Sequence, residues 1–411
     1  MSKDVKNVPA LRFKGYSDAW EKRKLGDLGS VAMNKRIYKD QTSDEGEIPF
    51  YKIGSFGKQA DAFISRKLFN EYKKLYPFPK KGDILISASG SIGRTIVYNG
   101  EDAYFQDSNI IWIQHDNRLD NTFLHQLFNI IRWSGVEGTT IKRLYNKNIL
   151  STQILLPSVE EQRSIGSLLD NVDNLIAATQ DKLSFLKKMK MFFLQQIFPT
   201  KDHDVPQIRF DGFTDAWSHY KLGSLMRIDK EQEVKKELLT DIQKGFYVLA
   251  MRTFSMDGYI DHSKPYWLNH LDNVSDDKFL LPREFAILDA DMDANLPKIG
   301  RVLLNASSEK YLLAAHVRKI QVKSGNDPIF IYALMRGNSV HERLKLEANG
   351  SISKRLLDKN VYKQSILVPN RSEQSKIGRL FFLLETTITL HQQKIQMLKQ
   401  VKKSCLQNLF I

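Results

Sequence analysis

The chain has 411 residues, and 61 Lys or Arg against 47 Asp or Glu give it a formal charge of +14. A hydrophobic content of 42% is enough for packed cores and excludes wholesale disorder, and the length suggests roughly two to three domains. The single cysteine, Cys405, excludes a disulfide framework and Cys-based zinc fingers. The polar N-terminus and the lack of a long apolar run predict a cytoplasmic protein without a membrane span. The basic balance favours an anionic partner such as nucleic acid, with a merely basic protein as the alternative.

The chain opens with a short lead that returns in its second half. Residues 9–20, PALRFKGYSDAW, match residues 206–217, PQIRFDGFTDAW. A longer match aligns residues 138–198 without a gap on residues 350–410, which are roughly a third identical. A period of about 200 residues is too long for a solenoid repeat of roughly 20 to 50. The sequence therefore predicts a tandem of two whole units, each with a lead, a variable body and a closing segment.

The first body has the pattern of a mixed α/β domain. Residues 82–94 predict a strand, a glycine turn and a second strand, and residues 95–98 and 109–114 are further β-rich runs. The turn contains Ser87, Ser89 and Ser91, and its backbone N–H groups could cradle a phosphate. A plain β-turn is the alternative. A helix-like stretch at residues 123–133 ends the body.

Val159 begins the first of two predicted long helices, with Ser158 as its N-cap and acids in its first turn. Apolar residues at alternating spacings of four and three form an a/d seam, which is typical of a coiled coil. About 38 residues give a rod of roughly 57 Å. The seam residues of the two helices are Ile165, Leu169, Val172, Ile176, Leu183 and Leu186, and Ile377, Phe381, Leu384, Ile388, Ile395 and Leu398.

Polar residues interrupt both seams at equivalent positions. Thr179 corresponds to His391, and Lys190 to Lys402. Such residues cost stability but can fix the register of a coiled coil. We interpret His391 as an ordinary seam residue and not as a metal ligand.

The second body repeats the framework of the first with different loops. Residues 285–288 and 302–304 are its counterpart strands, and residues 330–346 its helix-like end. In our alignment Phe285-Ala286 stands in place of Gly82-Asp83. Because of this difference, the geometry of the first body does not predict that of the loop near residues 291–297. The predicted fold is therefore α/β: two globular mixed α/β domains separated by two long helices that form an antiparallel coiled coil, with pseudo-twofold tandem symmetry.

Signatures of catalysis are absent from the sequence. There is no G-x-x-x-x-G-K-[ST], no G-x-G-x-x-G, and no Asn/Asp-Pro-Pro-aromatic run of the kind that amino-methyltransferases use. The nine histidines form neither H-E-x-x-H nor a close metal pair, so we expect no metal site.

Three motifs in this order point to a family. They are Arg-Phe-x-Gly-aromatic-x-x-x-Trp, Gly-Asp-Ile-Leu-x-Ser, and Leu-Pro-x-x-x-Glu-Gln-x-x-Ile before a coiled coil. Over essentially its whole length the chain resembles the specificity subunit of type I restriction-modification systems. The resemblance implies that each body is a target recognition domain reading one half of a split site in double-stranded DNA. It also implies that the helices are a spacer on which two adenine methyltransferase subunits dock, and that two restriction subunits, ATP-driven translocase-nucleases, join them.

The resemblance further implies that this chain is not an enzyme and binds no cofactor. S-adenosylmethionine, ATP and Mg are then expected on partner subunits. Under this interpretation the domains are residues 1–158 and 199–370, the two recognition domains with their lead or linker, and residues 159–198 and 371–411, the two helices.

Residue roles follow only in part from the resemblance. We expect phosphate contacts to supply affinity and base-edge contacts from divergent loops to supply specificity, with a solvated surface charge as the alternative for each basic residue. Trp20 and Trp217 are expected to be packing anchors. Glu161-Gln162 and Glu373-Gln374 are expected to fix the helix starts and to contact the methyltransferase, with helix capping as the alternative. The predicted DNA-binding residues are Ser87, Ser89, Ser91, Arg94, Lys142, Arg143, Arg252, Lys298, Arg301, Lys354 and Arg355.

Two other classes of function stay open at this point. One is a stand-alone DNA methyltransferase or nuclease with degenerate motifs, and the other is a coiled-coil scaffold without a nucleic-acid role. The distribution of charge bears on DNA affinity. Residues 1–158 carry 24 basic and 17 acidic side chains, or +7, whereas residues 201–369 carry 25 and 23, or +2. We therefore expect the first body to contribute more of the salt dependence of DNA binding.

Overall fold

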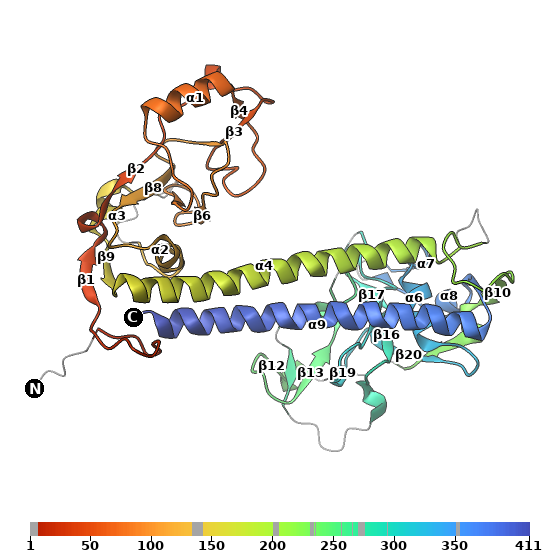
Figure 1. The fold of residues 1–411 in the computed structure, drawn as a ribbon. Helices are drawn as coiled ribbons and strands as arrows, with labels where there is room; N and C mark the ends of the chain where they lie inside the picture. The colour runs from red at the N-terminus through yellow and green to blue at the C-terminus, as the bar shows by residue number, and fades with distance from the viewer. Residues whose placement is uncertain are drawn as a thin grey trace, which may run out of the picture. The chain divides into compact units, whose positions relative to one another are not determined.

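The structure is a computed structural model that describes residues 7–133, 143–199, 205–230, 234, 236–255, 257–264, 266–269, 276–293, 295–350 and 354–411. The chain forms two compact units, one of residues 1–178 with 396–411 and one of residues 179–395. Each long helix, α4 (Val159–Gln196) and α9 (Arg371–Leu409), contributes to both units (Figure 1). The domain boundaries at residues 158, 198 and 370 stay a prediction, since the compact units divide within the helices.

The first unit is organised around a four-stranded antiparallel sheet in the order β2-β8-β5-β6. A three-stranded sheet, β4-β3-β7, contains a parallel β3–β7 pair, and β1 pairs with β9. The strands are β1 (Glu21–Lys24), β2 (Gly29–Ala32), β3 (Ile48–Tyr51), β4 (Phe63–Ile64), β5 (Ile84–Ser87), β6 (Thr95–Val97), β7 (Tyr104–Phe105), β8 (Ile110–His115) and β9 (Gln153–Leu156). The helices are α1 (Arg66–Leu75), α2 (Asn121–Phe128) and α3 (Asn146–Ser151), with 3₁₀ turns at Leu25–Asp27 and Lys39–Gln41.

Strand β5 is buried on both faces, which explains its unbroken apolar sequence. Ile84 and Ile86 face the core that includes the starts of α2 and α4, whereas Leu85 faces a second core. Ile111 and Trp112 of β8 divide between the same two cores. Successive side chains of a strand point to opposite faces, so one short run supports both cores.

The second unit repeats this topology. Its four-stranded sheet has the order β11-β20-β16-β18, and its five-stranded sheet, β12-β14-β13-β19-β15, contains a parallel β13–β19 pair. The strands are β10 (Ser218–Lys221), β11 (Met226–Ile228), β12 (Leu239–Thr240), β13 (Phe246–Leu249), β14 (Trp267–Leu268), β15 (Phe279–Leu280), β16 (Phe285–Leu288), β17 (Ala290–Asp291), β18 (Val302–Leu304), β19 (Tyr311–Leu313), β20 (Val317–Val322), β21 (Lys354–Arg355) and β22 (Ser365–Val368). The helices are α5 (Leu222–Leu225), α6 (Pro328–Arg336), α7 (Asn338–Leu346) and α8 (Asp358–Tyr362), with 3₁₀ turns at Lys236–Leu238, Met251–Thr253 and Asp276–Lys278.

The sequence alignment of the two bodies at β5 and β16 is wrong by two residues. Gly82 donates its N–H to the carbonyl of Tyr98, and Arg283 donates its N–H to the carbonyl of Asn305 in the same way. Gly82 has φ of 96° and Arg283 has φ of 68°, so both adopt the left-handed conformation. The counterpart of Gly82-Asp83 is therefore Arg283-Glu284. The alignment missed it because an arginine occupies a position where glycine is usual.

The body helices are shorter than predicted. Helix α2 begins after Asp120, whose carboxylate caps it, and ends at Phe128 instead of residue 133. The predicted stretch 330–346 is two helices, because Gly337 has ψ of 137° and breaks the helix between Arg336 and Asn338.

The long helices pair antiparallel, as predicted. In the first unit Ile165 and Leu169 near the start of α4 share a core with Leu409 at the end of α9. In the second unit Leu194 near the end of α4 shares a core with Ile377 near the start of α9. The predicted start at Val159 is confirmed, and α4 ends at Gln196, three residues before Pro199.

Candidate DNA interface and helix junctions

The glycine turn between β5 and β6 carries several predicted DNA-binding residues. The hydroxyl of Ser87 accepts from the backbone N–H of Arg94 at 2.9 Å and donates to the carbonyl of Ser91. Gly90 and Gly93 have φ of 65° and 81°, which allows the reversal. The N–H groups of Gly93 and Arg94 bond inside the turn, to the carbonyls of Ser87 and Ser91. These N–H groups are thus engaged in a β-turn, and Ser91 is exposed.

The structure brings Ser89 and Arg143 together. Nη2 of Arg143 lies 3.2 Å from Oγ of Ser108 and 3.3 Å from Oδ1 of Asn109, and donates to both. The hydroxyl of Ser89 donates to the same Oδ1 at 2.8 Å, and Ser89 and Arg143 also form a β-bridge. Asn109 therefore joins two predicted residues, which the sequence pattern did not reveal. Lys142 lies outside the described residues.

Arg94 and Arg301 follow equivalent turns and have similar environments. Both are half-buried. Arg94 donates to the carbonyl of Ile53 at 3.3 Å, and its guanidinium lies 5.3 Å from the ring centre of Phe56. Nε of Arg301 donates to the carbonyl of Pro297 at 2.7 Å. Burial lowers the pKa of Arg301 from its usual value, which reflects the cost of removing the charge from water.

Lys298 and Arg252 lie near each other in the second unit. Nζ of Lys298 donates to the carbonyl of Met251 at 3.3 Å. The neighbouring Arg252 is exposed, and its guanidinium lies 4.7 Å from the ring centre of Tyr266. An exposed guanidinium beside an aromatic ring suits contact with a phosphate or a base.

Lys354 and Arg355 form β21, which pairs with β17 so that Lys354 lies opposite Asp291. The guanidinium of Arg355 lies 3.8 Å from Oδ1 of Asp289. Arg318 also approaches Asp289, at 3.4 Å. Burial raises the pKa of Asp289 although both guanidinium groups oppose this. Sequence reasoning missed Asp289, which reduces the positive charge around Arg355.

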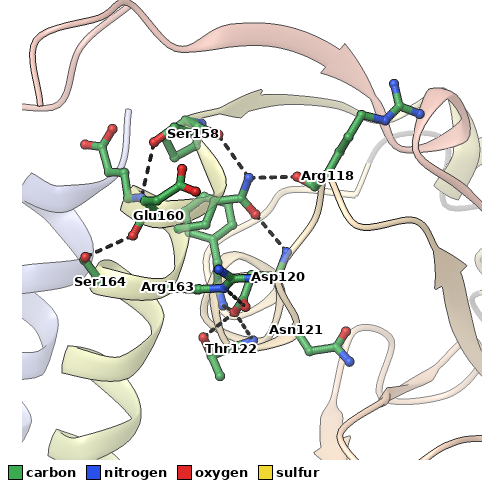
Figure 2. Close-up of polar contacts among 12 residues, drawn as sticks. Arg118, Asp120, Asn121, Thr122, Ser158, Glu160, Arg163 and Ser164 are labelled. Atoms are coloured by element: carbon green, nitrogen blue, oxygen red, sulfur yellow. Dashed lines mark hydrogen bonds and ion pairs between the residues drawn. The ribbon is translucent and has the colours of Figure 1, made fainter.

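The Glu-Gln pair at the start of α4 lies in a network of short hydrogen bonds in the first unit. Nε2 of Gln162 donates to the carbonyls of Pro157 and Arg118 at 3.0 and 2.9 Å, and its Oε1 accepts from the N–H of Asp120 at 2.8 Å (Figure 2). One buried amide thus joins β9, the loop before α2 and α4. The hydroxyl of Ser158 accepts from the N–H of Glu161 at 3.3 Å, which confirms the predicted N-cap.

Glu161 ties the lead to the helix. Its carboxylate accepts two hydrogen bonds of 2.7 Å from Arg12, and its side chain is 1% exposed. Arg163 lies 3.6 Å from the capping residue Asp120 of α2 (Figure 2). Arg12 belongs to the repeated Arg-Phe motif of the lead, and Glu161 belongs to the repeated Glu-Gln motif of the helix. The sequence repeat therefore marked both partners of this contact.

The second unit has the same junction. Arg209 donates to Glu373 at 2.7 and 2.8 Å. Gln374 donates to the carbonyl of Pro369 at 3.0 Å and accepts from the N–H of Asp327 at 2.9 Å. Both Glu-Gln pairs are buried and bonded inside their own units, so they fix the helix starts as predicted. Their expected contact with a methyltransferase stays a prediction.

Trp20 and Trp217 are packing anchors, as predicted. They are 3% and 6% exposed, and each makes an edge contact with an aromatic ring of its body helix, Phe123 and Phe330 respectively. The predicted seam is buried or half-buried throughout. The buried residues are Ile165, Leu169, Leu186, Ile377, Phe381, Leu384, Ile388 and Ile395, and the half-buried ones are Val172, Ile176, Leu183 and Leu398.

Among the residues that the structure describes, no cluster of three or more His, Cys, Asp or Glu side chains could hold a metal ion. No helix among them is both long enough and apolar enough to span a bilayer.

Two tandem α/β bodies, each packed against an antiparallel pair of long helices, define the architecture of this class of protein. The family model of the type I restriction modification DNA specificity domain matches residues 17–188 and again 214–400. The chain therefore belongs to this family. It is a non-catalytic specificity subunit of the type I restriction-modification kind, and the enzyme and scaffold alternatives are not favoured.

Individual relatives agree with this assignment. A putative type I restriction enzyme specificity subunit of Haemophilus influenzae is 55% identical over 152 residues, which are 37% of this chain and 40% of that protein. A putative type I restriction enzyme MjaX specificity subunit of Methanocaldococcus jannaschii is 21% identical over 93% of this chain and 91% of its own length. The crystal structure of a type I restriction-modification S subunit from M. genitalium matches with a TM-score of 0.70 at 14% identity, over 98% of this chain and 99% of that one, which shows the shared fold.

Proposed function

We propose that each body of this specificity subunit reads one half of a two-part site in double-stranded DNA. The observation that carries the proposal is the repeat itself: the same α/β body occurs twice, and each is fixed to the helix pair by the same Arg–Glu and Gln contacts. One chain thereby holds two recognition surfaces with different loops, and the length of the helix pair sets the gap between the half-sites.

The DNA contacts come from the basic loops of the two bodies. Arg94 and Arg143 in the first unit, and Arg252, Lys298 and Arg301 in the second, supply phosphate contacts that position the duplex. Arg94, Arg143, Lys298 and Arg301 lie in loops or at their ends, and Arg252 lies in the 3₁₀ turn Met251–Thr253. Side chains at such positions vary without disturbing the sheets. Ser91, Lys354 and Arg355, which are exposed or half-buried, extend the two surfaces, whereas Ser89 is buried and supports Asn109 from behind.

The partners follow from the same interpretation. Two adenine methyltransferase subunits dock on the helices, and two restriction subunits join them to form the restricting complex. S-adenosylmethionine, ATP and Mg act on those subunits. The complex acts on DNA in the cytoplasm.

Selection from a random duplex library tests the two-part site. The chain, reconstituted with its methyltransferase, should enrich one motif made of two short half-sites with a fixed gap. Replacing Arg252 and Lys298 by Ala should weaken or relax the half-site read by the second body and leave the other intact. Replacing the exposed Lys22 by Ala is the matched control and should change neither. An undivided motif, or equal loss at both half-sites, would contradict the proposal.

A further inference from the structure

Each unit contains a lysine–carboxylate contact between the two long helices. In the second unit, Nζ of Lys190 on α4 lies 2.8 Å from Oε1 of Glu385 on α9. In the first unit, Nζ of Lys402 on α9 lies 2.7 Å from Asp173 on α4. We call these two contacts the helix rungs. Asp173 and Glu385 occupy equivalent positions in the tandem repeat, and so do Lys190 and Lys402.

Each rung also includes a side chain from its body helix. The hydroxyl of Tyr332 on α6 donates to Glu385 at 2.6 Å. In the first unit the amide of Gln126 on α2 donates to Asp173 at 3.0 Å. Each rung therefore ties both long helices and one body together at a single point.

The rung of the second unit is deeply buried. Lys190 and Glu385 are each 2% exposed, and the hydroxyl of Tyr259 accepts a further hydrogen bond from Lys190. Unpaired charges at this depth are strongly disfavoured, whereas the apolar seam around them is tolerant. A slide of one heptad, about 10 Å along the helix, brings apolar seam residues opposite apolar seam residues again. The same slide separates each lysine from its carboxylate.

The arrangement of charges is the same on both helices. Helix α4 carries Asp173 and then Lys190, and α9 carries Glu385 and then Lys402, in each case 17 residues apart. One antiparallel register therefore satisfies both rungs at once. A parallel arrangement of the repeats would place carboxylate against carboxylate and lysine against lysine.

We infer that the two helix rungs, and not the apolar seam, select the single register of the antiparallel pair. Lys190, Glu385, Lys402 and Asp173 are thus positioning residues for the gap between the half-sites. The part that concerns the gap rests on the proposed function, whereas the selection of the register does not.

A variant whose second-unit rung carries no charge (the neutral-rung variant) distinguishes an effect on the register of the helices from an effect on the stability of the chain. Lys190→Met with Glu385→Gln removes both charges but keeps the length of each side chain and an acceptor for Tyr332. Replacing a buried ion pair by neutral groups of similar volume is often harmless to stability. Arg336, a third buried charge close to Glu385, keeps its hydrogen bond to the carbonyl of Asp257 in this variant. We therefore expect the melting temperature of the full chain to stay within a few degrees while the register becomes mixed.

The register is read from the other rung. A carbodiimide joins a carboxylate and an amine only when they touch, so the native chain should give a strong Asp173–Lys402 cross-link by mass spectrometry. The neutral-rung variant should give a several-fold lower yield at unchanged stability. Leu186→Met with Ile388→Leu, which alters the buried seam beside the rung without altering charge, is the matched control and should keep the native yield. Lys190→Arg should also keep it.

A neutral-rung variant that is well folded and cross-links at the native yield would overturn the inference. Should that variant fail to fold, the half-buried rung of the first unit, Lys402 with Asp173, offers a second test. Lys402→Glu places two carboxylates together, so the single register should be lost and the melting temperature should fall. Adding Asp173→Lys in the same chain should restore both the register and the melting temperature. Absence of restoration would also overturn the inference. Mapping of methylated sites then separates the two claims. A mixed register together with one fixed gap would refute the claim that the helix pair sets the gap between the half-sites. It would leave the claim about selection of the register intact.

Discussion

Replacing Glu161 by Ala should destabilise the first unit strongly, because Glu161 joins the lead to α4. Its carboxylate is almost fully buried and accepts two hydrogen bonds of 2.7 Å from Arg12, whose side chain is 15% exposed. Breaking a buried ion pair by removing one partner costs about 3–5 kcal/mol. The partial exposure of Arg12 favours the lower end, about 3 kcal/mol. For a unit of this size each kcal/mol lowers the melting temperature by about 2–4 °C, so we expect a drop of roughly 6–12 °C.

Scanning calorimetry of the full chain measures this effect. The neighbouring Glu160 is exposed and interacts mainly with the helix N-terminus, so Glu160→Ala should cost less than about 1 kcal/mol. Arg12→Ala with Glu161→Ala should cost clearly less than the two single changes added together, since the second change then removes no remaining partner. Equal effects of Glu161→Ala and Glu160→Ala would show that the junction contributes little and would refute the reasoning.

Three further predictions follow from charge and helix length. The DNA affinity of the reconstituted complex should fall as the salt concentration rises. In a plot of the logarithm of the binding constant against the logarithm of the salt concentration, the double change Arg94→Ala with Arg143→Ala should reduce the slope by about 0.9 for each phosphate that the variant no longer neutralises. An unchanged slope in a binding titration would exclude a phosphate-binding role for these arginines. Burial lowers the pKa of Lys190 to about 8 from its usual 10.5, against the pull of Glu385 and with Arg336 and Lys187 adding to the decrease. Above about pH 8 the unfolded chain therefore binds more protons than the folded chain. The free energy of unfolding of the native chain, measured in denaturant titrations relative to that of Lys190→Met, should rise between about pH 8 and 10.5. A difference in free energy that stays constant over this range would refute the prediction. One heptad inserted after both Leu186 and Leu398 keeps both helix rungs paired and extends the helix pair by about 10 Å. The gap in the methylated site should then grow by about three base pairs. An unchanged gap, or altered half-sites, would exclude a role of the helix pair in setting the gap.

The helices were predictable because their pattern is local and periodic. Alternating spacings of three and four define the seam from Ile165 onward, and Ser158 is a common type of N-cap. The buried strand β5 was equally clear from its apolar run between a charged turn and a glycine turn. Because each of these patterns occurs once in each half of the sequence, each copy supports the prediction made from the other.

The missed features depend on backbone geometry or on contacts between distant residues. Arg283 adopts a conformation that usually signals glycine, so residue type misaligned it with Gly82. Glu161 meets Arg12 from 149 positions away, and Asn109 meets Arg143 from 34 positions away, so neither contact has a local pattern. The DNA-binding residues lie in divergent loops, where charge predicts affinity but no spacing predicts which base edge is contacted.

The most direct test of the central claim is a map of adenine methylation in the native host, with this chain present and with it deleted. The account predicts that one two-part motif, with a fixed gap, is methylated on both half-sites only when the chain is present. Exchange of residues 201–349 for the second body of a relative should change one half-site and keep the other half-site and the gap. Persistence of the motif after deletion, or a change in both half-sites after the exchange, would contradict the account.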